Sequence, residues 1–264
     1  MNKKIIAVIA ILLAAAGLYC AFGGCGKTAA PEIEKIIVGL DDSFPPMGFK
    51  NEQNEIVGFD IDIAKEVAKR LSVPVEFKAI DWSSKEAELS SGRIDCIWNG
   101  LDITPEREKN MLFSDPYMNN RQLLFVRIDS SVKDLDGLAG KTIGLQNAST
   151  ADDNMEKQPE FKKTVTVKKY TDYIEAFIDL ENGRLEGVLA DEIVGRYYMS
   201  KRPGKFVCID KAFGPSAQFG IAFRKGNDSL RSLIQSKIDE ITADGTGAKI
   251  SEKWFGADLL LKKK

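Results

Sequence analysis

One arginine stands in a setting that suits an anion. Arg107 follows Thr104 and Pro105, a pair typical of the cap and the first position of a helix. The first turn of a helix leaves backbone N–H groups free, and a guanidinium can hold a carboxylate through two parallel hydrogen bonds. Arg107 and Thr104 are therefore candidates for a carboxylate site. The alternative is an exposed arginine at a helix start, which is where most arginines lie.

Two further polar positions follow apolar segments. Asp191 comes directly after Val188–Ala190, and a lone carboxylate at the end of a buried strand needs a partner. Ser149 lies three residues before Asp152, which is the spacing of a helix cap. Asp191 and Ser149 could each be plain helix caps. A cap still leaves N–H groups that an anion can bind, so Ser149 and Thr150 remain candidates for an anion site.

The composition limits the chemistry that these residues could perform. The 264-residue chain contains no histidine, which removes the commonest general base and the commonest zinc ligand. We therefore expect no metal site and no cofactor. The net charge of −2 gives no electrostatic basis for binding nucleic acid. An enzyme of this composition would have to work with carboxylates, lysine, tyrosine or cysteine.

Strand and helix patterns alternate along the chain. Residues 36–40 form an apolar run, and residues 75–80 alternate as a strand does. Between them, apolar residues recur at helical spacing from Phe59 to Leu71. Ser83 and Glu86 have the spacing of a capping box for the next helix. This alternation predicts an α/β protein with layers of helices on largely parallel sheets.

The chain also contains a weak internal repeat. Residues 89–98 resemble residues 180–189, and each segment reads as a helix end, a glycine and a buried strand. Polar residues follow both strands, at 99–102 and 190–192. Ligands of open α/β sheets bind beyond the carboxyl ends of the strands, so two such halves facing each other would form a cleft. Coincidence is the alternative, because this unit is common in α/β proteins.

Seven short motifs follow one another along the chain: Phe44–Met47, Gly58–Asp62, Gly92–Asp95, Ile103–Arg107, Phe113–Tyr117, Gly140–Gly144 and Asp191–Glu192. In this order they resemble a known family, the polar-amino-acid (family 3) solute-binding proteins of ABC importers. The resemblance covers essentially everything after residue 33.

The resemblance implies the periplasmic-binding-protein fold. In this fold two α/β lobes, each a mostly parallel sheet flanked by helices, are joined by two crossover strands. The expected first lobe comprises residues 35–125 and 220–260, and the expected second lobe residues 126–219.

The resemblance also implies a role for each candidate residue. Arg107, Thr104, Ser149 and Thr150 would hold the carboxylate of an amino acid. Asp191 would hold its ammonium, assisted by Asp102 and by the carbonyl of Gly100. The aromatic side chains of Phe44 and Trp82 would form walls around the ligand side chain, with Asp41 and Asn99 nearby. Core packing is the alternative for Phe44, and Asp41 would favour a basic ligand.

The implied function is transport, not catalysis. A monomeric receptor would capture an L-amino acid between its lobes and deliver it to an ABC permease in the membrane. One alternative on the same fold is a periplasmic cyclohexadienyl or prephenate-type dehydratase, with Asp191 or Glu192 as its general acid. Another is a ligand-sensing partner of a receptor.

The first residues read as an export segment. Residues 1–25 have a basic start and a short apolar run, and residues 26–34 would form a tether. Cys25 follows two glycines, as a lipid-modified cysteine of a bacterial lipoprotein would. Simple secretion is the alternative, and Cys20 is the weaker lipidation candidate. Cys96 and Cys208 are expected as buried thiols, although export would also permit a disulfide.

Overall fold

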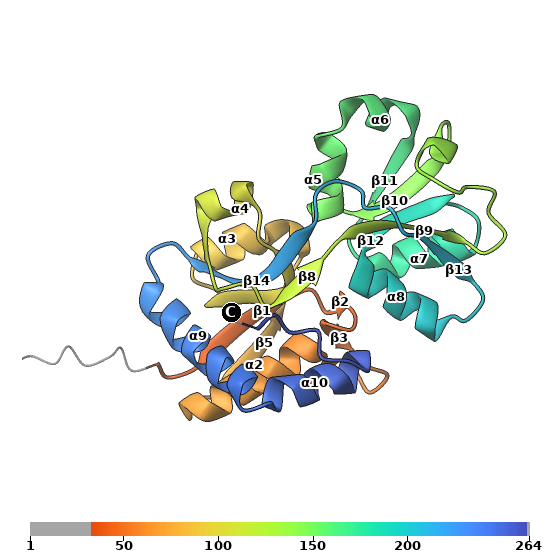
Figure 1. Cartoon of the computed structure of the whole chain (residues 1–264). Coiled ribbons are helices and arrows are strands. Elements are labelled where there is room, and N and C mark those ends of the chain that lie inside the picture. Colours follow the sequence, from red (N-terminus) through yellow and green to blue (C-terminus); the bar gives the residue numbers. More distant parts are fainter. Residues whose placement is uncertain (1–32, 263–264) are drawn as a thin grey trace, which may run out of the picture. The chain divides into compact units, whose positions relative to one another are not determined.

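A computed structural model describes residues 33–262 of the chain (Figure 1). The expected export segment, Cys25 and almost all of the expected tether lie outside these residues. Within them, no helix combines the length and the apolar composition that crossing a membrane requires. The fold is α/β, as the alternating patterns predict, and it is built on two larger sheets and one small one.

The first sheet has strand order β5-β1-β6-β14-β7, with β8 also paired to β14. Its first three strands run parallel, and β14 runs antiparallel to each of its partners. Every residue of β6 is buried, which explains its nearly continuous apolar sequence. The bounds are β1 Ile36–Leu40, β5 Val75–Ala79, β6 Cys96–Asp102, β7 Met111–Phe113, β8 Met118–Asn120 and β14 Ala217–Arg224.

Helices from both ends of the described chain pack together on this sheet. Figure 1 shows α2 (Phe59–Leu71), α9 (Asp228–Ala243) and α10 (Thr246–Phe255) side by side. The shorter α3 (Lys85–Ser90) and α4 (Pro105–Asn110) follow β5 and β6, and a 3₁₀ turn at Trp82–Ser84 precedes α3. A small antiparallel sheet comprises β2 (Ser43–Phe44), β3 (Gly48–Lys50) and β4 (Ile56–Val57).

The second sheet has strand order β11-β10-β12-β9-β13. Strands β10, β11 and β12 are parallel, whereas β9 is antiparallel to β12 and β13. Both large sheets are therefore mixed and not mostly parallel. The strands are β9 Gln122–Arg127, β10 Thr142–Gln146, β11 Thr166–Tyr170, β12 Gly187–Asp191 and β13 Phe206–Ile209; the helices are α5 Thr150–Glu156, α6 Pro159–Thr164, α7 Tyr173–Glu181 and α8 Glu192–Lys201, with a 3₁₀ turn at Asp136–Leu138.

The weak internal repeat is a structural repeat. Gly92 and Gly183 end α3 and α7 with φ of 74° and 73°, a left-handed conformation that glycine adopts without strain. Each glycine N–H donates to the carbonyl three residues earlier, at Leu89 and Leu180. The strands that follow, β6 and β12, pair in parallel with β1 and with β10, respectively. Asp102 and Asp191 therefore end equivalent strands.

The chain passes between the two sheets twice. Asn120 ends β8 in the first sheet and Gln122 begins β9 in the second, so Arg121 marks the first crossing. The chain returns between β13 and β14. We call the part around the first sheet the first lobe and the part around the second sheet the second lobe. The expected lobe boundaries at 125/126 and 219/220 fall inside β9 and β14, because each apolar strand belongs to one sheet throughout.

The structure tests two local predictions, a helix cap and the burial of two cysteines. The predicted capping box at Ser83 and Glu86 is wrong, because the Asp81 carboxylate accepts the Ser83 N–H at 2.8 Å and caps the 3₁₀ turn instead. Cys96 and Cys208 are free thiols, and they lie in different sheets. Cys96 is buried as expected, but Cys208, on the edge strand β13, is only half-buried.

Candidate functional site

Two carboxylates from different lobes share the same hydrogen-bond donors. The Asp191 Oδ1 accepts from the Asn120 amide at 2.6 Å and from the Gln122 amide at 2.7 Å. The Asp102 carboxylate accepts from the same two amides, at 3.0 and 3.1 Å from Asn120 and at 3.3 Å from Gln122. All four side chains are buried. Because Asn120 and Gln122 flank the crossing at Arg121, the first crossing positions both carboxylates.

The proximity of the two carboxylates changes their protonation. The pKa of Asp191 is raised to about 7, first by burial and then by the charge of Asp102, although the amide hydrogen bonds oppose the rise. The pKa of Asp102 is also raised by burial, against hydrogen bonds from Asn120 and Thr150 and the charge of Arg107. Like charges held together in a buried place attract a cation, and a cation would favour the ionised form of both groups.

Arg107 lies beside this pair and reaches both lobes. Its Nη1 donates to the backbone carbonyl of Asp102 at 3.0 Å and to the Thr150 hydroxyl at 3.2 Å. Its Nη2 lies 3.4 Å from an oxygen of Asp153, whose side chain is 46% exposed. Arg107 is itself buried, so the alternative of a surface arginine is wrong. A buried guanidinium with one distant, half-exposed carboxylate partner retains capacity for another anion.

The caps predicted around the arginine are present. The Thr104 hydroxyl accepts the Arg107 N–H at 3.3 Å, and Pro105 occupies the first position of α4. The Ser149 hydroxyl accepts the Asp152 N–H at 3.2 Å and caps α5. Thr150 is buried against Arg107. These caps bring the starts of α4 and α5, one from each lobe, to the same guanidinium.

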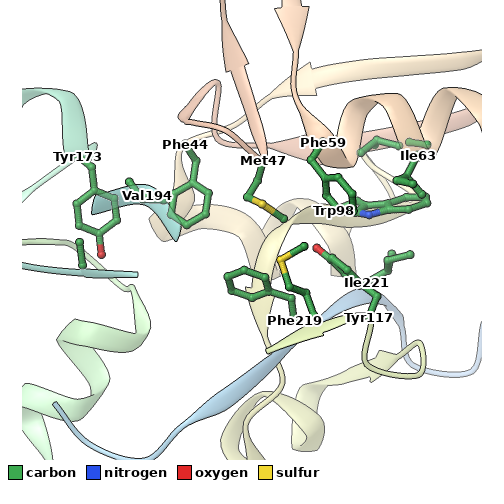
Figure 2. Close-up of a cluster of buried hydrophobic side chains, with 14 of the residues drawn as sticks. Phe44, Met47, Phe59, Ile63, Trp98, Tyr117, Tyr173, Val194, Phe219 and Ile221 are labelled. Atoms are coloured by element: carbon green, nitrogen blue, oxygen red, sulfur yellow. The ribbon is translucent and has the colours of Figure 1, made fainter. Parts of the chain in front are cut away.

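Aromatic side chains adjoin the charged groups. The rings of Phe44 and Trp82 are nearly parallel, with centroids 6.5 Å apart and an interplanar angle of 10°. Figure 2 shows Phe44 between Met47 and Tyr173, and its ring centroid lies 6.0 Å from that of Tyr173, in α7 of the second lobe. Phe44 is therefore packed in a core cluster, which is the alternative to a role as a wall of the site. Its ring also faces Trp82.

Asp41 makes a polar contact between the lobes. Its Oδ2 accepts from the Gln146 amide at 2.6 Å, and its Oδ1 accepts the Ser43 N–H at 2.8 Å. Burial raises the pKa of Asp41 to about 6, against the hydrogen bonds from Gln146 and Ser43. Asp41 thus joins the end of β1 to the end of β10.

Asn99 and Gly100 shape the first lobe's side of the site. The Asn99 side chain accepts the Asp41 N–H at 3.1 Å and reaches the Gly48 carbonyl at 3.5 Å, so both ends of its amide contact first-lobe backbone. Gly100 has φ of 57°, and a Cβ placed on it would lie 2.8 Å from the Phe44 ring. The register between β6 and β14 also shifts here. Position 100 therefore requires a glycine, because of its backbone conformation and because the Phe44 ring leaves no space for a Cβ.

Several residues of this region escape the sequence patterns. Asn120 and Gln122 are polar residues that interrupt the apolar pattern near the start of β9. This interruption is the sequence feature from which they could have been predicted. Gln146 is the last residue of β10, as Asp191 is of β12. Tyr173 reads as one more apolar helix residue, yet burial and the charges of Asp191, Asp102 and Asp41 hold the pKa of its phenol well above its usual value. Lys85 reads as an ordinary exposed helix residue but is buried.

The arrangement suits binding more than metal chemistry. In residues 33–262, no group of three or more histidine, cysteine, aspartate or glutamate side chains has a geometry that could hold a metal ion. The site instead places a cation, Arg107, against the backbone of a carboxylate residue, Asp102. It can hold a small molecule that carries an anionic and a cationic group close together.

Comparisons with known proteins agree with this chemistry. Residues 36–257 match the model of the bacterial extracellular solute-binding proteins, family 3. ABC transporter arginine-binding protein 1 of Escherichia coli (strain K12) is 36% identical over 233 residues, which are 87% of this chain and 93% of that protein. The L-cystine-binding protein TcyJ of the same strain is 30% identical over 261 residues, 98% of this chain and 97% of that protein.

A solved structure is similar over the same range. The substrate-binding protein of an ABC uptake transporter from Streptococcus pneumoniae, solved with bound histidine, has a TM-score of 0.83 and 35% sequence identity. The match covers 87% of this chain and 95% of that one. These relatives are binding proteins with the two-lobed fold.

Proposed function

Because the chain belongs to the bacterial extracellular solute-binding proteins of family 3, we propose that it is the substrate-binding component of an ABC importer. It captures an L-amino acid between its two lobes and delivers it to the permease. The observation that carries this proposal is the contact between Arg107 and the Asp102 carbonyl at 3.0 Å. An α-amino acid bears its carboxylate and its ammonium on one carbon, so its receptor needs a cation and carboxylates close together. The contact places the Arg107 guanidinium beside the residue that carries the Asp102 carboxylate.

Each part of the ligand then has a partner. The guanidinium of Arg107 holds the carboxylate, with help from Thr104, Ser149 and Thr150. The ammonium lies at Asp191 and Asp102, where it takes over hydrogen bonds that Asn120 and Gln122 now donate. The Gly100 carbonyl adds a third acceptor. Pairing every charge is necessary, because a buried unpaired charge is costly.

The ligand side chain lies against Phe44 and Trp82. Aromatic faces bind both apolar stems and cations. Asp41 adds a carboxylate that favours a basic side chain, and its pKa of about 6 leaves it mostly ionised at neutral pH. The amide of Gln146 shares that carboxylate, so Asp41 and Gln146 together set the polarity of this part of the site. Asn99 supports the subsite by fixing the backbone of Asp41.

A second candidate function is the prephenate-type dehydratase. The observation that favours it is the pKa of Asp191, raised to about 7, which suits a general acid at neutral pH. Glu192 suits that role less, because its side chain accepts hydrogen bonds from Arg121 at 2.8 and 3.0 Å. Prephenate carries two carboxylates and no amine, so it would set an anion against Asp102 and Asp191. The transport receptor accounts better for that pair, and a ligand-sensing role would use the same site with another partner.

A thermal-shift screen separates these functions. The purified protein is tested against the standard L-amino acids, L-cystine and prephenate, because a ligand that binds only the folded form raises the melting temperature. We expect a clear rise with one or a few amino acids and none with prephenate. Turnover of prephenate without any amino-acid response would overturn the proposal.

The receptor acts outside the cytoplasm as a lipid-anchored monomer. The argument for the anchor is Cys25 after two glycines, at the end of an apolar run. Mass spectrometry of the membrane fraction tests it. A lipid-modified N-terminal peptide beginning at Cys25 is the expected result, and a released protein with free Cys25 would contradict it.

A further inference from the structure

Lys85, the first residue of α3, is buried and spans the two lobes. Its Nζ donates to the Trp82 carbonyl at 3.2 Å in its own lobe and to the Ala148 carbonyl at 2.9 Å in the other. The same Nζ lies 5.0 Å from the centroid of the Trp82 ring. Only 4% of the residue is exposed. Lysine is rarely buried without a carboxylate partner, and within residues 33–262 no carboxylate forms an ion pair with Lys85.

The backbone that Lys85 contacts is itself unusual. Ala148 has φ of 56°, a left-handed conformation that non-glycine residues seldom adopt. Its N–H donates to the Asp152 carboxylate at 3.0 Å. The second lobe therefore fixes the N–H of Ala148, while the first lobe fixes its carbonyl through Lys85. Ser149 and Thr150 follow directly, so the conformation of Ala148 sets where they lie.

Lys85 also places a second positive charge beside Arg107. The pKa of Lys85 is lowered to about 8 by burial and by the charge of Arg107. The acidic groups that face it oppose this shift only in part: Asp153 from α5, and Glu86 and Asp81 from its own segment. A groove of about 600 Å³ is lined by Lys85, Arg107, Glu86 and Asp153, and further by Glu106, Glu156 and Lys157. A carboxylate bound at Arg107 would relieve the repulsion between the two cations.

We propose that Lys85 is a positioning residue of the carboxylate subsite: by binding the Ala148 carbonyl, it holds the Ser149–Thr150 turn of the second lobe against Arg107. This inference rests on the proposed function for its consequence, which is tighter ligand binding. The contact with Ala148 does not depend on any ligand. The two parts are therefore tested by separate experiments.

The first experiment needs no ligand. Amide hydrogen exchange at residues 149–152 is compared among the wild type, Lys85→Met and Lys65→Met. Lys65 is the matched control, because its Nζ lies 5.8 Å from the Phe77 ring, away from the second lobe. We expect faster exchange in Lys85→Met alone, without a lower melting temperature, since methionine fills the buried volume without a desolvated charge. Unchanged protection, or a general loss of stability, would overturn the inference.

The second experiment measures affinity against pH. Wild type and Lys85→Met are titrated calorimetrically with each standard L-amino acid that binds the wild type. Loss of a charged donor is expected to weaken binding about tenfold at pH 7. A bound carboxylate favours protonated Lys85, so the wild-type advantage is full below the pKa of about 8 and declines above it.

The titration of the ligand's own amine changes the affinity of both proteins equally, so its effect cancels in the ratio of the two affinities. A ratio of one at every pH, or one that does not change with pH, would contradict the role of Lys85. If no amino acid binds the wild type, the proposed function fails. The exchange experiment then still decides whether Lys85 holds the turn.

Discussion

At the scale of single residues, the paired carboxylates lower the stability of the folded protein when no ligand is bound. Asp102 and Asp191 lie together, buried, and hydrogen-bonded to the same two amides. The pKa of each is raised, so the folded protein favours their protonated forms. Function and stability therefore oppose each other here, as is common at binding sites.

Asp191→Asn tests this opposition through its pH dependence. The pKa of Asp191 is about 7 in the folded protein against a usual value of 3.8. A carboxyl group whose pKa is higher in the folded than in the unfolded chain stabilises the fold when it is protonated. This contribution is fully present at a pH below the pKa of the unfolded chain, and it is lost as the pH rises towards 7. At pH 8 we expect Asp191→Asn to raise the ligand-free melting temperature by about 3 °C, which corresponds to roughly 1 kcal/mol in a chain of this size.

A control variant should show the opposite sign. Hydrogen bonds from Lys168, Tyr170 and Arg184 hold the pKa of Asp179 well below its usual range, so Asp179→Asn should lower the melting temperature at pH 8. Thermal denaturation of both variants at pH 5 and pH 8 gives the comparison. A melting temperature of Asp191→Asn below that of the wild type at pH 8 would show that the carboxylate stabilises the empty protein.

At the scale of elements, strand β6 is irregular at Gly100, close to Phe44. Gly100 turns the chain with φ of 57° and lies against Phe44. In Gly100→Ala, the backbone strain costs about 1–2 kcal/mol, and the added Cβ also meets the Phe44 ring. We expect amino-acid binding to weaken at least tenfold, because Phe44 must move away from its place in the site.

Gly140→Ala is the matched control for this element. Gly140 has φ of 74°, but nothing lies within 4 Å of an added Cβ. Its alanine variant should therefore lose stability and keep its affinity. Both variants are measured by chemical denaturation and by calorimetry with the amino acid found in the screen. Equal affinities for the two alanine variants would remove Gly100 from the site.

The elements also show how far sequence reasoning reaches. Elements such as β1 and α2 match their expected bounds, and the caps at Thr104 and Ser149 are present, because each depends on a few neighbouring residues. Features that depend on distant parts of the chain are missed. Lys85 looks solvent-exposed until the turn at Ala148 covers it, and Asn120 looks like a loop residue until the carboxylates of both lobes meet at its amide.

At the scale of the whole molecule, several of the polar contacts of the site join the two lobes. Arg107 reaches Thr150, Asp41 reaches Gln146, and the amides at the crossing bridge Asp102 to Asp191. A ligand that takes over such contacts binds both lobes at once and thereby favours their closed arrangement. The ordered motifs predict that a ligand is captured between the two lobes, but the amide donors Asn120 and Gln122 are recognised only in the structure.

The central claim is that the site recognises the α-carboxylate and the α-ammonium of one molecule together. The measurement that tests it most directly is calorimetric titration with the amino acid found in the screen, its methyl ester and its N-acetyl derivative. The ester removes the charge that we propose Arg107 binds, and acetylation removes the charge that we propose Asp102 and Asp191 bind. We expect the free amino acid to bind and each blocked derivative to bind at least a hundredfold more weakly, because each leaves a buried charge unpaired. Comparable affinity for either derivative would contradict the account.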